Sequence, residues 1–179
     1  MIKILLIAIP VLIVVFLVAA AMQPKEFRIA RSVTIAAPAA VVFDQINDFH
    51  KWDKWSPWAK MDPDAKNSFE GPASGVGAAF AWDGNSQVGA GKMTVTESRP
   101  GELLRIQMEF IKPFAATHTV EFIFKPQGTD TVLTWSMAGE NSFMAKAVTL
   151  IMNCDKMVGG QYEKGLAEIK SLSEAAAKK

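Results

Sequence analysis

Two histidines, one cysteine and one tyrosine are the side chains of this sequence whose chemistry stands out. His118 shares strand parity with Val120 and Phe122, so it is expected to point into an apolar interior. An imidazole placed there acts as a general base or as a hydrogen-bonding anchor for a ligand. The alternative is a histidine at the start of a strand that backbone or water satisfies. No partner carboxylate is identifiable from the sequence, so the catalytic residues are left unassigned.

The remaining reactive groups support no metal or thiol chemistry. A single cysteine, Cys154, rules out an intramolecular disulfide and a thiolate metal cluster. His50 and His118 lie far apart in the sequence and leave little from which to build a zinc site. We therefore expect neither a metal nor a cofactor. Tyr162 offers a hydroxyl that either hydrogen-bonds a ligand or belongs to a packed core.

The charge balance bears on possible partners. Lysine and arginine number 19 against 18 aspartates and glutamates, which gives a formal net charge of +1. A nucleic-acid backbone is held by an excess of positive charge, and this chain has none. A nucleic-acid partner is therefore not expected.

The N-terminal segment has the composition of a membrane anchor. From Ile4 to Met22 the chain runs without a charge, and a helix of that length spans about 28 Å, close to the hydrocarbon thickness of a bilayer. We expect a single-pass anchor over residues 1–23 and a folded domain over residues 24–179. The competing interpretation is a signal sequence cleaved near Ala19-Ala20-Ala21. Basic residues flank the segment on both sides, so the side of the membrane on which the domain lies is left open.

The domain is predicted to contain one antiparallel sheet and a long C-terminal helix. Phe27 to Ala36 alternates as a strand, and a short amphipathic helix follows from Pro38. Short alternating runs separated by turn residues then predict six further strands: Asn67 to Glu70, Ala78 to Trp82, Lys92 to Ser98, Leu103 to Lys112, His118 to Pro126 and Thr131 to Gly139. Apolar residues recur at helical spacing from Met144 to Leu172 and predict the long helix. Gly159-Gly160 within it indicates either a bend or a close approach by a neighbour.

One face of these strands is apolar and must be covered, and the long helix supplies the cover. Strand parity and the helical stripe together predict which residues line a cavity between sheet and helix. They are Trp82, Met108, Phe110, His118, Phe122, Phe124, Trp135, Met137, Met144, Ile151, Val158 and Tyr162. Three tryptophans crowd the segment before the meander, where Trp52 and Trp55 form either a packed corner or the rim of a pocket. Parity alone does not separate a cavity wall from a filled core.

The predicted order of elements is that of the α+β helix-grip fold, in which a curved sheet wraps the last helix. Several motifs resemble the bacterial START-like (SRPBCC) proteins of the polyketide cyclase/dehydrase and lipid-transport group. They are Trp52-x-x-Trp55-Ser-Pro-Trp58, Trp82-Asp-Gly-Asn85 followed by Gly89-Ala-Gly91, Thr134-Trp-Ser-Met137, and Lys156-Met-Val-Gly159 leading to Tyr162-Glu-Lys-Gly-Leu166. The resemblance spans roughly Phe27 to Glu174 and implies this fold.

The resemblance does not single out one function, because such proteins include lipid carriers and aromatic cyclases. Our first hypothesis is a membrane-tethered binding module that holds a hydrophobic small molecule or lipid. The second is a cyclase or dehydratase-type enzyme, for which His118 is the candidate titratable group. A third, weaker hypothesis is a chaperone-like interaction domain, which predicts a filled core and an exposed apolar patch.

Overall fold

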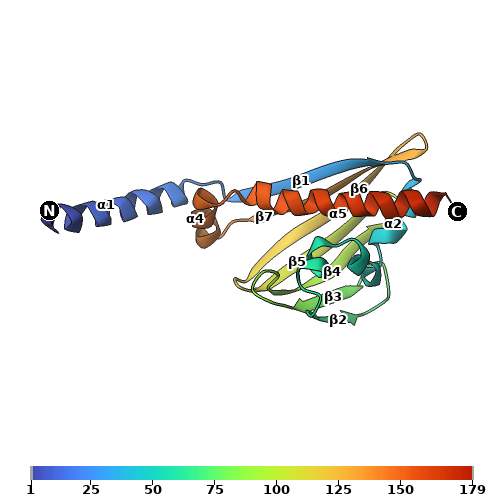
Figure 1. Cartoon of the computed structure of the whole chain (residues 1–179), viewed down its shortest axis with the longest axis horizontal. Helices are drawn as coiled ribbons and strands as arrows, with labels where there is room; N and C mark the ends of the chain where they lie inside the picture. The colour runs from blue at the N-terminus through green and yellow to red at the C-terminus, as the bar shows by residue number, and fades with distance from the viewer. Residues whose placement is uncertain (1, 179) are drawn as a thin grey trace.

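The computed structural model describes the backbone of residues 2–178 and the side chains of residues 9–178. Within these residues the chain forms an N-terminal helix, a curved sheet with short helices between its first two strands, and two C-terminal helices (Figure 1). In chain order the elements are α1 (Ile2–Ala21), β1 (Glu26–Ile35), α2 (Ala39–Ile46), η1 (Phe49–Lys54), α3 (Pro57–Met61), β2 (Lys66–Glu70), β3 (Ala79–Asp83), β4 (Ala90–Arg99), β5 (Leu103–Lys112), β6 (Ala116–Gln127), β7 (Asp130–Glu140), α4 (Phe143–Ile151) and α5 (Cys154–Ala177).

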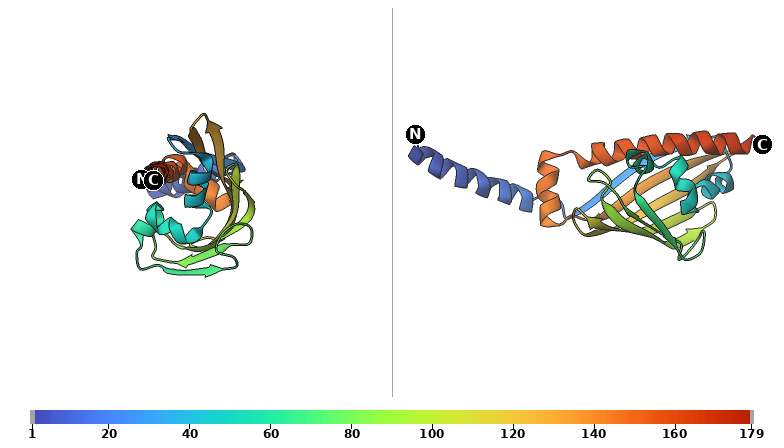
Figure 2. Two further views of the ribbon diagram at one scale, coloured as in Figure 1. Left: turned by 90° about the vertical axis from the view of Figure 1, so that its right-hand side faces the viewer. Right: turned by 60° about the horizontal axis from the view of Figure 1, so that its bottom comes forward.

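The strands confirm the predicted meander. Across the described residues they form one seven-stranded antiparallel sheet in the order β1-β7-β6-β5-β4-β3-β2. Strands that follow one another in the chain from β2 to β7 are neighbours in the sheet, and β1 is the edge strand beside β7. Figure 2 shows the sheet curving around one side, with α5 running along its concave face. The helix-grip architecture that the sequence predicts is therefore confirmed.

The long C-terminal helix is not continuous, and the prediction of one helix from Met144 to Leu172 is wrong. Met152 adopts extended backbone angles, φ −120° and ψ 132°, between α4 and α5. The Ser142 side chain accepts a hydrogen bond from the Ala145 N–H at 3.2 Å, and the Asn153 side chain accepts one from the Lys156 N–H at 2.9 Å. Serine and asparagine are preferred N-caps, so each helix begins at its own cap residue.

Aromatic side chains pack together between the sheet and α5. The Trp135 ring on β7 lies face to face with the Tyr162 ring on α5, with ring centroids 4.0 Å apart and planes 10° from parallel. Phe122 stacks on the other side of this pair, at 5.0 Å from Trp135. Trp52 and Trp55 of the η1 region pack edge-on against Phe122. Full burial of a large apolar side chain contributes about 1.5–3 kcal/mol, so this cluster is a main source of stability.

Arg31 fixes the start of α5 to the edge strand β1. Its guanidinium donates to the Glu163 carboxylate at 2.9 Å and to the Asp155 carboxylate at 2.9 Å. The guanidinium also lies directly over Gly159, where an added Cβ would come within 2.1 Å of the Arg31 Nη2. Of the two interpretations of Gly159-Gly160, the close approach by a neighbour therefore holds, and the neighbour is the Arg31 side chain at Gly159.

The N-terminal helix α1 extends away from the sheet (Figure 1). Its described side chains are apolar and solvent-exposed from Val11 to Val18. No helix in the described part of the chain qualifies as a membrane span by length and hydropathy. The predicted anchor, Ile4 to Met22, includes residues 4–8, whose side chains lie outside the described set.

The adjacent glycines of α5 give a matched test of this packing. An added Cβ at Gly160 would meet nothing within 4 Å among the described residues, so Gly160→Ala should raise the free energy of unfolding by about 1 kcal/mol through helix propensity. Gly159→Ala gains the same propensity but displaces Arg31 from both carboxylates, and should therefore be the less stable of the two variants. Urea denaturation measures the difference. Equal stabilisation by both changes would contradict the proposed role of Arg31.

Candidate functional site

One cross-strand row of the concave face runs through every strand of the sheet. From β2 to β1 its members are Phe69, Phe80, Met93, Met108, His118, Gly139 and Phe27, each directly opposite the next. His118 supplies the one polar side chain of this row. The register thus confirms that His118 faces the concave side, as strand parity predicts.

This row is the boundary between the buried and the partly exposed parts of the concave face. The neighbouring row toward the aromatic cluster is fully buried and consists of Val95, Ile106, Val120, Met137 and Ile29. Met108, His118 and Phe27 are only half-buried, as are Trp82 and Phe110 one row further out. We call these five residues, Phe27, Trp82, Met108, Phe110 and His118, the open end of the sheet.

His118 lies at the centre of the open end among aromatic rings. Phe27 meets it edge-on with ring centroids 5.0 Å apart, and Phe110 lies at 5.7 Å. Its Nδ1 is buried and has no hydrogen-bond partner among the described residues. Gly139 makes room for the ring, since a Cβ there would lie 2.3 Å from the Nδ1. The imidazole therefore presents an unpaired polar atom to an apolar surrounding, an arrangement that costs free energy until a partner is supplied.

The environment of His118 favours the neutral imidazole. Burial is the main cause that lowers the pKa of His118 below its ordinary value of 6.5, with a smaller opposing effect from a backbone hydrogen bond at Thr117. Desolvation penalises the charged form because the apolar surroundings replace water. At neutral pH, His118 can therefore offer one nitrogen as a hydrogen-bond acceptor or as a proton acceptor.

A second glycine shapes the open end at Trp82. The Trp82 ring lies flat over Gly91, where an added Cβ would come within 2.5 Å of the ring. Its indole N–H donates to the Val88 carbonyl at 3.2 Å, which holds the ring against the turn before β4. Phe110 meets this ring edge-on at 6.1 Å. Trp82 is thus a fixed, half-buried apolar wall with its polar atom already satisfied.

Several residues predicted to line a cavity belong to the filled core. The side chains buried among their neighbours are Phe122, Phe124, Trp135, Met137 and Tyr162. Burial raises the pKa of the Tyr162 hydroxyl, which keeps it protonated. The stacking of its ring on Trp135 leaves Tyr162 only 2% exposed. Tyr162 is therefore a packed core residue, which was one of the two alternatives, and not a residue that offers its hydroxyl to a ligand.

The helical part of the predicted cavity set needs a correction. Met144 is 57% and Ile151 77% exposed, because both lie on α4, which is separate from the helix that covers the sheet. Neither lines the space beneath α5. Val158, in the second turn of α5, is half-buried against the core.

The prediction that Trp52 and Trp55 form a pocket rim is also wrong. Trp52 is 7% exposed and Trp55 fully buried. Their indole N–H groups donate to the carbonyls of Ile46, at 2.8 Å, and Gln45, at 3.1 Å. Both polar atoms are therefore satisfied within the domain, and the two rings form the packed corner that was the alternative interpretation.

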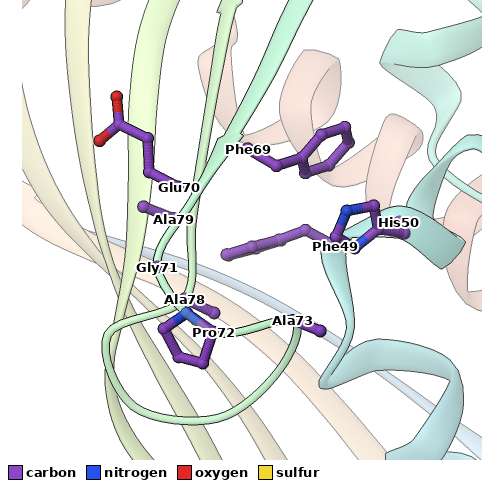
Figure 3. A pocket seen from close by; sticks show the side chains of 9 residues that line it. All are labelled: Phe49, His50, Phe69, Glu70, Gly71, Pro72, Ala73, Ala78 and Ala79. Carbon is purple, nitrogen blue, oxygen red and sulfur yellow. The ribbon is translucent and has the colours of Figure 1, made fainter.

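Two surface hollows are separate from the space between the sheet and α5. The smaller, of about 250 Å³, sits between η1 and the β2–β3 edge, where the rings of His50 and Phe69 stack at 4.1 Å (Figure 3). The larger, of about 440 Å³, is bordered by the cross-strand neighbours Gln107, Thr119 and Ala138, and also by His118 and Gly139. The side chains of Gln107, Thr119 and Ala138 have the parity opposite to the concave row, so the larger hollow opens on the outer face of the sheet.

The sequence analysis did not identify Phe27, Gly91 and Gly139 as parts of the site. Alternation placed Phe27 on the same face as Ile29, but nothing in the sequence indicated that β1 brings it against His118. Within the described residues, no group of three or more histidine, cysteine, aspartate or glutamate side chains could hold a metal ion. What the open end can do chemically is bury an apolar surface and exchange one hydrogen bond or proton through His118.

Comparisons with known proteins concern the domain as a whole. A family model for polyketide cyclase / dehydrase and lipid transport proteins matches residues 26–174. No curated protein matches the sequence. Protein CV1439 from Chromobacterium violaceum is similar in structure, with a TM-score of 0.59 and 15% identity, over 85% of this chain and 99% of that one.

Two named cyclases have the same fold. The di-domain ARO/CYC StfQ from the steffimycin biosynthetic pathway matches with a TM-score of 0.62 and 13% identity, over 87% of this chain and 53% of its own. The Zhui aromatase/cyclase from Streptomyces sp. R1128 matches with a TM-score of 0.58 and 14% identity, over 83% of this chain and 94% of its own. At these identities the likeness establishes the fold alone.

The lowered pKa of His118 predicts a specific pH dependence of stability. Below pH 6.5 the unfolded chain binds a proton at His118 that the folded chain does not bind, so stability should fall as the pH drops through this value until the folded pKa is reached. His118→Gln removes this contribution. Urea unfolding at pH 7.5 and 5.5 compares the two proteins, and carboxylate effects common to both cancel. An identical pH dependence in wild type and variant would contradict the buried position of His118.

Proposed function

The chain belongs to the polyketide cyclase/dehydrase and lipid transport family, and from this premise we propose that it is a membrane-tethered binding module for a hydrophobic small molecule or lipid. The ligand lies against the open end of the sheet, beneath the start of α5. Apolar burial supplies the affinity, and His118 supplies the orientation.

The half-buried concave row with one unpaired polar atom is the observation that carries this proposal. A buried polar group without a partner costs about 1–3 kcal/mol. Trp135 Nε1 and Ser173 Oγ are also buried and unpaired among the described residues, but both residues lie within the packed interior, whereas His118 lies where the concave face is only half-buried.

A ligand with an apolar body and one hydroxyl or other hydrogen-bonding group removes that cost once the His118 ring turns its Nδ1 away from Gly139. The aromatic and thioether surfaces of Phe27, Phe110 and Met108 adapt to varied apolar shapes.

The tether rests on the character of α1. Large apolar side chains are exposed at every position from Val11 to Val18, which includes more than two turns and so every side of the helix. A helix that is apolar on all sides suits a surrounding of lipid. Such a tether keeps the open end near a source of apolar ligands.

An enzyme of the cyclase or dehydratase type is the second candidate. The observation that favours it is the same unpaired Nδ1, because a neutral imidazole in an apolar site can act as a general base. The solved structures of similar fold include aromatase/cyclases. In this alternative, the apolar wall positions the substrate and His118 moves the proton.

One half-buried and one exposed apolar position provide a test of the binding site. Phe110 is half-buried on the concave face, whereas Val76, in the turn before β3, is 60% exposed. Phe110→Ser should weaken retention of an apolar ligand several-fold, since half the burial of a phenylalanine side chain amounts to about 1 kcal/mol. Val76→Ser should leave it unchanged. Native mass spectrometry of the full chain released from detergent micelles measures the adduct.

Lipids bound around α1 are common to both variants and so do not affect this comparison. Circular dichroism is the control for the folding of Phe110→Ser. Met108→Gln repeats the test one row inward. A bare wild-type mass, or equal adducts in all variants, would rule out a ligand at the open end.

The two candidate functions separate at His118. A general base contributes about 10²–10⁴-fold to a rate, so in an enzyme His118→Gln abolishes turnover of a bound polyketide while the adduct remains. For the binding module we expect no turnover by wild type and faster ligand loss from His118→Gln. Chromatography of extracted adducts before and after incubation measures both. Turnover by wild type that His118→Gln eliminates would replace the binding module by the enzyme.

A further inference from the structure

One side of α4 exposes a continuous apolar surface. Phe143, Met144, Val148 and Ile151 follow the spacing of a single helical face, and all four are exposed. Lys146 supplies the one charge of the helix and points away from this face by helical geometry. A short helix with one apolar and exposed face is unusual on a surface that meets only water.

The β5–β6 turn exposes apolar side chains at the same end of the molecule. Ile111 is 62% and Phe114 65% exposed. Figures 1 and 2 both show this turn, α4 and α1 together at one end of the domain. We call Ile111, Phe114 and the α4 residues Phe143, Met144, Val148 and Ile151 the end surface. Its members come from segments distant in sequence, so it is not a single hydrophobic stretch.

The end surface adjoins the open end of the sheet. Phe110 is next to Ile111 at the end of β5, and Phe27 lies in the first residues of β1, shortly after α1. The start of α5, which packs on β1, follows α4 directly. The end surface therefore borders the route by which an apolar ligand reaches His118.

Lipid is the partner that these features fit. α1 packs against α4, and α1 exposes apolar side chains in all directions, which a single protein groove does not cover. Two of the nearby lysines are paired, Lys25 with Glu140 at 3.0 Å and Lys112 with Asp83 at 2.9 Å, and Lys146 lies away from the apolar face of α4. The contact is therefore one of apolar insertion, as in helices that lie in a membrane interface, rather than attraction to anionic headgroups.

We propose that the end surface lies in the interfacial layer of a lipid bilayer and turns the open end of the sheet toward the membrane. This inference rests on the proposed tether and deepens it, because it makes the bilayer the direct source or acceptor of the ligand. A ligand then moves between lipid and His118 without crossing water.

Site-specific fluorescence tests this placement. In a Cys154→Ser background of the full chain, Met144→Cys, Ile151→Cys and Phe114→Cys each carry an environment-sensitive dye in phosphatidylcholine vesicles that contain either a shallow or a deep nitroxide lipid. Val14→Cys reports the tether, and Thr129→Cys, at the turn after β6, is the distant control. We expect strong quenching at Val14 by the deep nitroxide, strong quenching at Met144, Ile151 and Phe114 by the shallow one, and none at Thr129 by either. Added salt should leave the quenching unchanged.

The outcomes separate the two levels of the proposal. Quenching at Val14 without quenching at Met144, Ile151 and Phe114 overturns the end surface and leaves the tether standing, whereas no quenching at Val14 overturns both. A dye shift that depends on protein density but not on nitroxide lipid identifies a second copy as the partner and also overturns the proposal. Met144→Gln with Ile151→Gln should slow ligand uptake from the vesicle that holds the protein several-fold, while the exposed control Val76→Gln should not. Equal uptake by both would contradict the proposed route.

Discussion

The stack of Trp135 on Tyr162 is the contact on which the rest of the domain depends. It joins the sheet to α5 over a ring-to-ring distance of 4.0 Å, and Gly165 allows the approach, since a Cβ there would lie 2.8 Å from the Trp135 ring. The η1 tryptophans complete this half of the interior. Beyond this stack and the η1 tryptophans the concave face is only half-buried, and this is where the open end lies.

Two glycines on the concave face determine where the His118 Nδ1 lies. Gly91 and Gly139 have no side chains, and this leaves room for the rings of Trp82 and His118. The His118 ring is thereby pressed into an apolar row with its Nδ1 unpaired, and its pKa is lowered by burial. Binding and catalysis are alternative uses of this same atom, and the geometry that serves both is set by packing rather than by a network of polar partners.

The architecture and the inward face of each strand could be predicted from the sequence, but the degree of burial of each side chain could not. Alternation is a local signal, so it placed His118 and Phe122 correctly on one side of β6. It could not tell that Phe122 is sealed by η1 while His118 is not, because that difference arises from contacts between distant segments. The break between α4 and α5 was missed although Ser142 and Asn153 are cap residues, because the apolar spacing continues across it. Met144 and Ile151 were consequently assigned to the wrong surface.

Methyl NMR of the methionines tests the central claim most directly, since they sample each environment of the domain. Met108 lies in the open end, Met137 in the filled core and Met144 on the end surface. When the full chain in detergent micelles is titrated with a long-chain fatty alcohol, we predict a saturable shift of the Met108 methyl signal and an unchanged Met137 signal. His118→Gln should weaken that saturation. A Met108 signal that never moves, or shifts confined to Met144, would contradict a ligand held beneath α5.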